Sequence, residues 1–101
     1  MKTKTAKINT PIADGVNRRF FQAIEALVLC GRLSALESFC NEAGLSAPRY
    51  RETRYTYGVT PRTDKVSRYK SVEIEGIYYL AKSYGVSSEW LLMGRGEMFK
   101  K

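Results

Sequence analysis

The sequence predicts an all-α fold, a compact bundle of about five short helices around a central helix-turn-helix. Three observations lead to this prediction. Apolar residues recur at intervals of three and four in separate stretches, which is the period of a helix that buries one face. Capping residues and glycines separate these stretches. The length of 101 residues suits one domain and is too short for two.

The chain begins with a basic stretch that is expected to form a flexible arm. Residues 1–13 carry three lysines and no apolar segment of the kind found in a signal peptide. The helical domain is therefore expected over residues 14–101. No stretch approaches the roughly 20 apolar residues of a membrane span. We therefore expect a cytoplasmic protein with no membrane partner.

The first helix is predicted to begin after Asp14 or Asn17, because either side chain can accept a hydrogen bond from the free N–H groups at a helix start. It is expected to end near Cys30, before Gly31. The apolar residues of this stretch share one face with helical spacing. They are Phe20, Phe21, Ile24, Leu27 and Val28.

Two short helices with a tight turn between them are predicted in the middle of the chain. Ser34 and Glu37 fit an S-x-x-E capping box, which marks the start of the second helix. Gly44 suits the left-handed end of that helix. Ser46 can cap a third helix that has Pro48 in its first turn, where the missing N–H costs nothing. Two helices joined in this way form a helix-turn-helix whose second helix projects as a convex ridge.

The remaining segments are a loop and two further helices. Residues 58–70 have no helical period and are expected to form a basic loop or a short hairpin. A fourth helix is predicted from about Ser71 to Tyr84, and Ser87 is expected to cap a short final helix. The residues expected to pack inward in these last elements are Ile74, Ile77, Tyr78, Ala81, Trp90, Leu91, Met98 and Phe99.

Positive charge is concentrated in one quarter of the chain. The formal net charge is +7, and residues 46–70 hold seven Lys and Arg against two Asp and Glu, a net of +5. A cluster of this kind is typical of a surface that meets phosphate. A solvated basic loop is the alternative that charge alone leaves open.

Two motifs resemble a known family. Residues 84–99 read YGVSSEWLLMGRGEMF and are similar to the closing helix of the phage-repressor-like (lambda-repressor-like) helix-turn-helix domains, the group that includes the Xre-type and CI-type repressors. Residues 39–46, FCNEAGLS, are similar to the family's segment between its second helix and its recognition helix. The resemblance spans about residues 17–99. It implies a homodimer that binds double-stranded DNA sequence-specifically and regulates transcription as a repressor.

The candidate DNA contacts lie in the third helix and the loop after it. The resembling family has polar readers where this chain has Ala47 and Pro48. Base reading is therefore expected from Arg49 and Glu52, with Ala47 available for a thymine methyl. The following connection is longer than the family's and is expected to touch the DNA backbone as a wing or to form a solvated loop. The candidate residues are Ser46, Ala47, Arg49, Arg51, Glu52, Arg54, Tyr55, Arg62, Lys65 and Arg68.

The residue types present argue against an enzyme. The sequence has no histidine, which excludes histidine-based acid–base catalysis, Ser–His nucleophiles and histidine-ligated metals. Cys30 and Cys40 are expected to lie buried on apolar helix faces. We therefore expect no catalytic residue, metal site, cofactor or small-molecule substrate. The alternative to DNA binding is a protein-interaction module on the same scaffold, such as an antitoxin or a regulator-binding protein, and Ala47 and Pro48 favour it.

Overall fold

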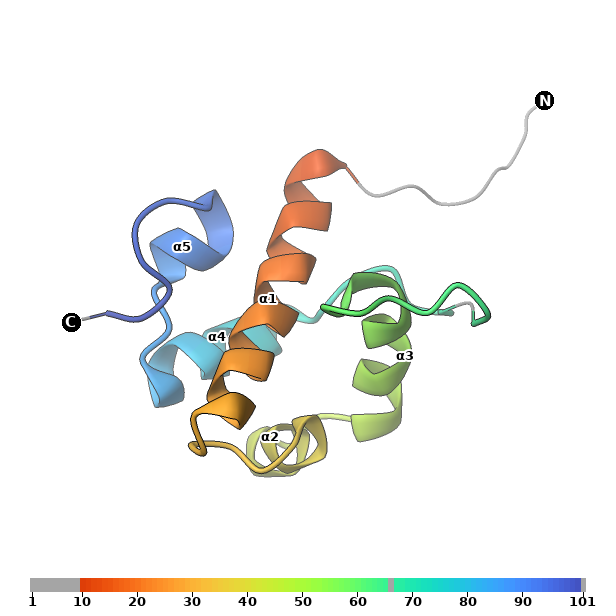
Figure 1. Ribbon diagram of the computed structural model, residues 1–101, viewed down its shortest axis with the longest axis horizontal. Helices are drawn as coiled ribbons and strands as arrows, with labels where there is room; N and C mark the ends of the chain where they lie inside the picture. The colour runs from red at the N-terminus through yellow and green to blue at the C-terminus, as the bar shows by residue number, and fades with distance from the viewer. Residues whose placement is uncertain (1–9, 66, 101) are drawn as a thin grey trace.

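Five α-helices make up the described part of the chain, residues 10–65 and 67–100, in the computed structural model (Figure 1). The longest helix runs through the middle of the molecule and the other four lie around it. The prediction of an all-α bundle of about five helices is confirmed. The helices are α1 (Pro11–Leu29), α2 (Leu36–Ala43), α3 (Ala47–Tyr57), α4 (Ile74–Tyr84) and α5 (Ser88–Met93).

α1 begins earlier than the sequence predicts. Its cap is Thr10, whose hydroxyl accepts a hydrogen bond of 3.1 Å from a backbone N–H of the first turn, and Pro11 is the first helical residue. Asp14 therefore lies inside the first turn, where a carboxylate suits the helix dipole. Asn17 is buried on the inner face and is not a cap. Residues 1–9 of the expected arm lie outside the described residues.

The capping box predicted for α2 is wrong. The cap residue is Ala35, which makes no side-chain hydrogen bond to the helix. Because the helix starts one residue later than the box requires, Ser34 stands outside the cap position and its hydroxyl lies against that of Ser38. The other end is as predicted. Gly44 has a φ of 72°, in the left-handed region that glycine adopts without strain.

α4 begins at Ile74 rather than near Ser71, and its buried face differs from the predicted one. Ile74 and Tyr78 were expected to pack inward but are 69% and 61% exposed. The reason is a close approach between helices. A Cβ atom on Gly76 would lie 2.5 Å from the Tyr50 hydroxyl, so α4 packs with its glycine against that ring. The buried residues of α4 are Gly76, Ile77 and Leu80.

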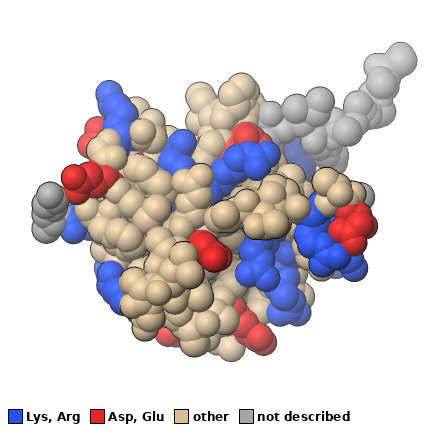
Figure 2. Space-filling model, viewed as in Figure 1, with Lys and Arg blue, Asp and Glu red and all other residues tan. Residues whose placement is uncertain are grey.

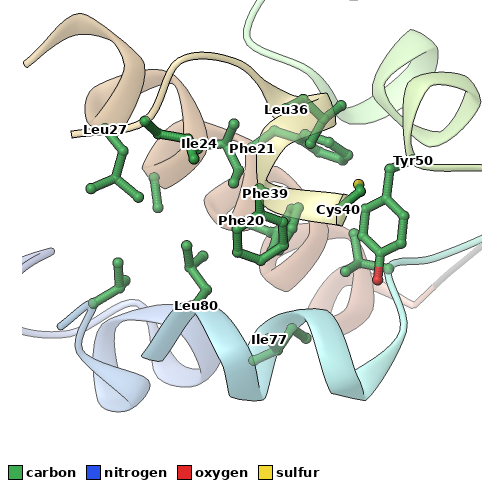
Figure 3. Packing of buried hydrophobic residues seen from close by; sticks show 14 of the residues in the cluster. Phe20, Phe21, Ile24, Leu27, Leu36, Phe39, Cys40, Tyr50, Ile77 and Leu80 are labelled. Atoms are coloured by element: carbon green, nitrogen blue, oxygen red, sulfur yellow. The ribbon is translucent and has the colours of Figure 1, made fainter. Parts of the chain in front are cut away.

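The core is built around aromatic rings from three helices (Figure 3). The ring centre of Phe20 in α1 lies 5.6 Å from that of Phe39 in α2 and 5.7 Å from that of Tyr50 in α3. Leu80 from α4 and Leu91 from α5 are fully buried in the same cluster. Burial of a large apolar side chain stabilises a fold by about 1.5–3 kcal/mol. Each helix thus contributes to one common core, and this core positions α3.

The last residues fold back onto the core, as predicted. The backbone N–H of Ser87 donates to the carbonyl of Met98 at 2.7 Å, and the N–H of Lys100 donates to the carbonyl of Gly85 at 2.9 Å. Ser87 also caps α5, because its hydroxyl accepts from the N–H of Trp90 at 3.2 Å. Trp90 packs against the core and remains partly exposed.

The two cysteines differ in their surroundings. Cys40 is fully buried, as predicted, and burial raises the pKa of its thiol to about 11. Cys30 is exposed, contrary to the prediction, because it follows the last residue of α1. Among the described residues, no helix is long and apolar enough to span a bilayer. In the same part of the chain, no three His, Cys, Asp or Glu side chains are grouped so as to hold a metal ion.

Candidate nucleic-acid interface

α2 and α3 are joined by a three-residue turn, which is the connection length of a helix-turn-helix. At the start of the turn, the backbone N–H of Leu45 donates to the carbonyl of Cys40 at 2.8 Å, and the Leu45 side chain packs against the core. At its end, the Ser46 hydroxyl accepts from the N–H of Arg49 at 3.3 Å and caps α3. Both ends of the turn are therefore determined by local hydrogen bonds.

α3 divides into a buried face and an open face. Tyr50, Thr53 and Tyr57 face the interior, and the Thr53 hydroxyl donates to the carbonyl of Arg49 at 2.9 Å. Figure 2 shows Lys and Arg side chains gathered over α3 and the loop that follows it. The open face, which is exposed or half-buried, consists of Pro48, Arg51, Glu52, Arg54, Tyr55 and Thr56.

The first turn of α3 offers few groups that could contact a base. Ala47 is only 8% exposed, so little of its methyl group is available to a thymine. Pro48 is exposed but has no backbone N–H to donate. Base reading would therefore depend on longer side chains.

Arg49, the first predicted reader, is held by residues that precede α4. Its Nη1 lies 3.6 Å from Oε2 of Glu73, and its guanidinium carbon lies 4.7 Å from the centre of the Tyr69 ring, a cation–π distance. Its Nε is buried, and no described residue accepts from it. The Tyr50 hydroxyl donates to Oε1 of the same Glu73 at 3.2 Å. Burial and the Glu73 charge raise the pKa of Tyr50. Arg49 thus ties α3 to the start of α4.

Glu52, the second predicted reader, is occupied by an arginine from the loop. Nε and Nη2 of Arg68 lie 3.1 Å and 2.5 Å from Oε2 of Glu52, and the Arg68 backbone N–H donates to Oε1 at 3.1 Å. These hydrogen bonds hold the pKa of Glu52 below its usual range. The Arg68 side chain is 74% exposed and that of Glu52 only 19%, so the arginine covers the carboxylate. At this position the open face of α3 therefore presents the exposed guanidinium of an ion pair.

Two of the predicted DNA contacts, Arg51 and Arg54, have side chains that remain exposed to solvent. Both are exposed on α3, and among the described residues neither has a carboxylate within ion-pair distance. Arg54 also borders a shallow cleft of about 310 Å³ between α1 and the start of the loop. The other residues that line this cleft are Glu25, Tyr55, Val59, Thr60 and Arg62.

The loop between α3 and α4 adds further cations to the same side of the molecule. Arg62 pairs with Asp64 through Nε at 3.0 Å and Nη2 at 2.7 Å. This pairing raises the pKa of Arg62 and lowers that of Asp64. Nζ of Lys65 lies 6.0 Å from the centre of the Tyr55 ring on α3. The loop therefore folds back along α3.

The end of this loop is anchored by Asn17, which the sequence suggested as a possible cap of the first helix. Asn17 is 2% exposed, its Oδ1 accepts from the N–H of Val72 at 2.9 Å, and its Nδ2 lies 3.5 Å from the carbonyl oxygen of Lys70. Together with Tyr69 and Glu73, it positions the basic loop against α3. A signal was present in the sequence, because an asparagine in line with an apolar stripe needs a buried partner.

Comparison of the chain with protein-family models, with curated proteins and with solved structures finds no match. The structure brings the candidate residues of α3 and of the loop together on one side, and it ties Arg49 and Glu52 to internal partners.

Proposed function

We propose that this protein binds double-stranded DNA sequence-specifically and acts as a transcriptional regulator of the repressor type, in the cytoplasm. The observation that carries the proposal is the open face of α3, which projects from a helix-turn-helix with Arg51 and Arg54 uncovered. A helix presented in this way fits the DNA major groove, which is about 12 Å wide.

Phosphate contacts would come from α3 and the loop together. Arg51 and Arg54 lie on the helix, and Lys65 extends the positive surface along it. Arg62 lies in the same loop, where its charge is balanced by Asp64. Each cation that neutralises a phosphate releases condensed counterions. The affinity for any duplex should therefore fall as the salt concentration rises, with a slope of about 0.9 for each phosphate contact on logarithmic axes.

A band-shift titration against salt tests this proposal. Arg51→Ala combined with Arg54→Ala should weaken binding to every duplex and reduce the salt slope by about 1.8, because two phosphate contacts are lost. The matched control is Arg95→Ala combined with Lys100→Ala, which removes the same charge from exposed positions after α5. It should leave the slope unchanged. An affinity that is the same at low and moderate salt, or equal losses in the two double variants, contradicts DNA binding by α3.

We also propose that the protein forms a homodimer. Paired helix-turn-helix modules read two half-sites about one DNA turn apart. Exposed apolar side chains on α4 and α5 offer a contact surface, namely Ile74, Tyr78, Leu92 and Met93. Sedimentation at micromolar concentration should show twice the chain mass of 11.5 kDa. Tyr78→Ser combined with Met93→Ser should reduce it to the monomer. A monomer in the wild type, with and without its DNA site, would contradict the dimer.

A protein-interaction module with little or no specific DNA binding is the alternative, and one observation favours it. Ala47 is buried, and Arg49 and Glu52 are held by internal partners, so three of the predicted readers are engaged within the chain. The scaffold would then hold another protein, as an antitoxin holds a toxin. Pull-down with and without nuclease distinguishes the two functions. A partner that stays bound after nuclease treatment, together with no preferred duplex, would support the alternative.

A further inference from the structure

The structure points to a reading residue outside α3. We propose that Arg68, presented by the loop between α3 and α4 and held by Glu52, reads a guanine in the major groove. This inference rests on the proposed DNA binding. It makes Glu52 a positioning residue for Arg68 rather than a reader of its own.

The hydrogen bonds between Arg68 and Glu52 use one edge of the guanidinium. Nε and Nη2 of Arg68 both point at Oε2 of Glu52, and Nε also lies 3.2 Å from Oε1. A guanidinium has five N–H donors in a rigid planar arrangement that forms two forks. Glu52 takes the fork made by Nε and Nη2. The fork made by Nη1 and Nη2 is left, and Nη1 of Arg68 has no acceptor among the described residues.

Two further contacts restrict the direction of the Arg68 side chain. Its backbone N–H donates to Oε1 of Glu52 at 3.1 Å, and its guanidinium carbon lies 5.5 Å from the centre of the Tyr69 ring. The same ring lies against the guanidinium of Arg49, which is itself paired with Glu73. Arg68 therefore has less rotamer freedom to lose on binding than a solvated arginine has.

The remaining fork has the geometry that guanine requires. Two parallel N–H donors pair with O6 and N7 of guanine, which is the commonest specific contact in the major groove. Glu52 lies one turn after Pro48 on the open face of α3, so the guanidinium of Arg68 stands beside the surface that would enter the groove. A phosphate accepts the same two donors, but a lysine can replace arginine at a phosphate as a point charge, whereas it cannot supply the two parallel donors that guanine pairs with. Arg68→Lys therefore distinguishes the two contacts.

Arg68→Lys separates the two kinds of contact. The duplex that the wild-type protein selects from a random pool is first determined, and Kd is then measured for each single-base change and for an unrelated duplex. Arg68→Lys should remove the preference for guanine at one position, a loss of about 5- to 150-fold in discrimination. The Kd for the unrelated duplex should stay the same. Arg95→Lys is the matched control, because Arg95 pairs with Glu89 at 3.5 Å in the α5 region, and it should change neither Kd.

Glu52→Gln tests the positioning role. Removal of the carboxylate makes the surface more positive, so the affinity for the unrelated duplex should rise while the guanine preference falls. A variant that had merely lost structure would lose both. In an Arg68→Lys background, Glu52→Gln should have no further effect on base preference. If Glu52 itself read a cytosine, it would alter base preference equally in both backgrounds, which would overturn its positioning role.

The outcomes of these measurements separate this inference from the proposed function. Discrimination that is unchanged at every position in Arg68→Lys overturns the assignment of Arg68, while DNA binding by α3 stands. A wild-type protein that selects no duplex overturns both. A guanine preference that is lost in Arg68→Lys and kept in Arg95→Lys supports both.

Discussion

Removal of the Asn17 side chain should destabilise the domain and loosen the end of the basic loop at Val72. Asn17 is 2% exposed, and its Oδ1 is the partner of the Val72 backbone N–H at 2.9 Å. In Asn17→Ala that buried N–H loses its partner, which costs about 1–3 kcal/mol. In a domain of this size, each kcal/mol lowers Tm by roughly 4–8 °C. A loss in the middle of these ranges corresponds to a decrease of about 12 °C.

Thermal unfolding with a local probe measures this effect. Asn41→Ala is the control, because it removes the same amide from an exposed position in α2 and should change stability by less than about 0.5 kcal/mol. Native-state hydrogen exchange should show the Val72 amide exchanging faster in Asn17→Ala by more than the global loss of stability explains. Equal melting temperatures for the two variants, or a Val72 amide as protected as in the wild type, would refute the reasoning.

Gly94→Ala should destabilise the protein by about 1–2 kcal/mol in urea unfolding, because Gly94 has a φ of 72° and a side chain there pays the cost of the left-handed region. Wild-type stability would contradict this. In Arg68→Ala, carbon NMR should show the lowered pKa of Glu52 returning to its usual range. Because the folded pKa is the lower one, the pair stabilises the fold above the unfolded pKa of about 4.3 and loses this effect as the pH falls through the folded pKa. A pH–stability curve identical to that of wild type would exclude such linkage. A thiol reagent should modify Cys30 in the native protein and Cys40 only after denaturation, since burial raises the pKa of the Cys40 thiol to about 11. Rapid modification of both in the native state would show that Cys40 is accessible.

Helix ends were predictable where a single residue acts on the backbone close to it. Gly44 and Gly85 adopt the left-handed conformation at the ends of α2 and α4, and Ser46 and Ser87 cap the helices that follow. The apolar period also gave the number of helices. The capping box predicted at Ser34 was wrong, because that box requires α2 to begin one residue earlier than it does. Local patterns do not specify register to one residue.

The candidate site was predictable only in part. Arg49 and Glu52 lie on α3 as expected, but their partners come from later in the chain, Arg68 from the stretch without helical period and Glu73 from the residue before α4. Which side chains pair across two segments depends on how the helices pack. That packing includes the close approach of Gly76 to an aromatic ring, and no local pattern encodes it. The sequence predicted that positive charge would gather in α3 and the loop after it. It did not predict which of these cations would pair with carboxylates of the same chain.

Selection of DNA by the wild-type protein from a random pool of duplexes tests the central claim most directly. DNA reading through α3 and Arg68 predicts enrichment of a short motif with an essential G·C pair, and a homodimer predicts two copies of it about 10–10.5 base pairs apart. The strength of this binding should fall steeply with salt. A pool that stays random after repeated rounds, at low as well as at moderate salt, would contradict the claim that this protein reads DNA.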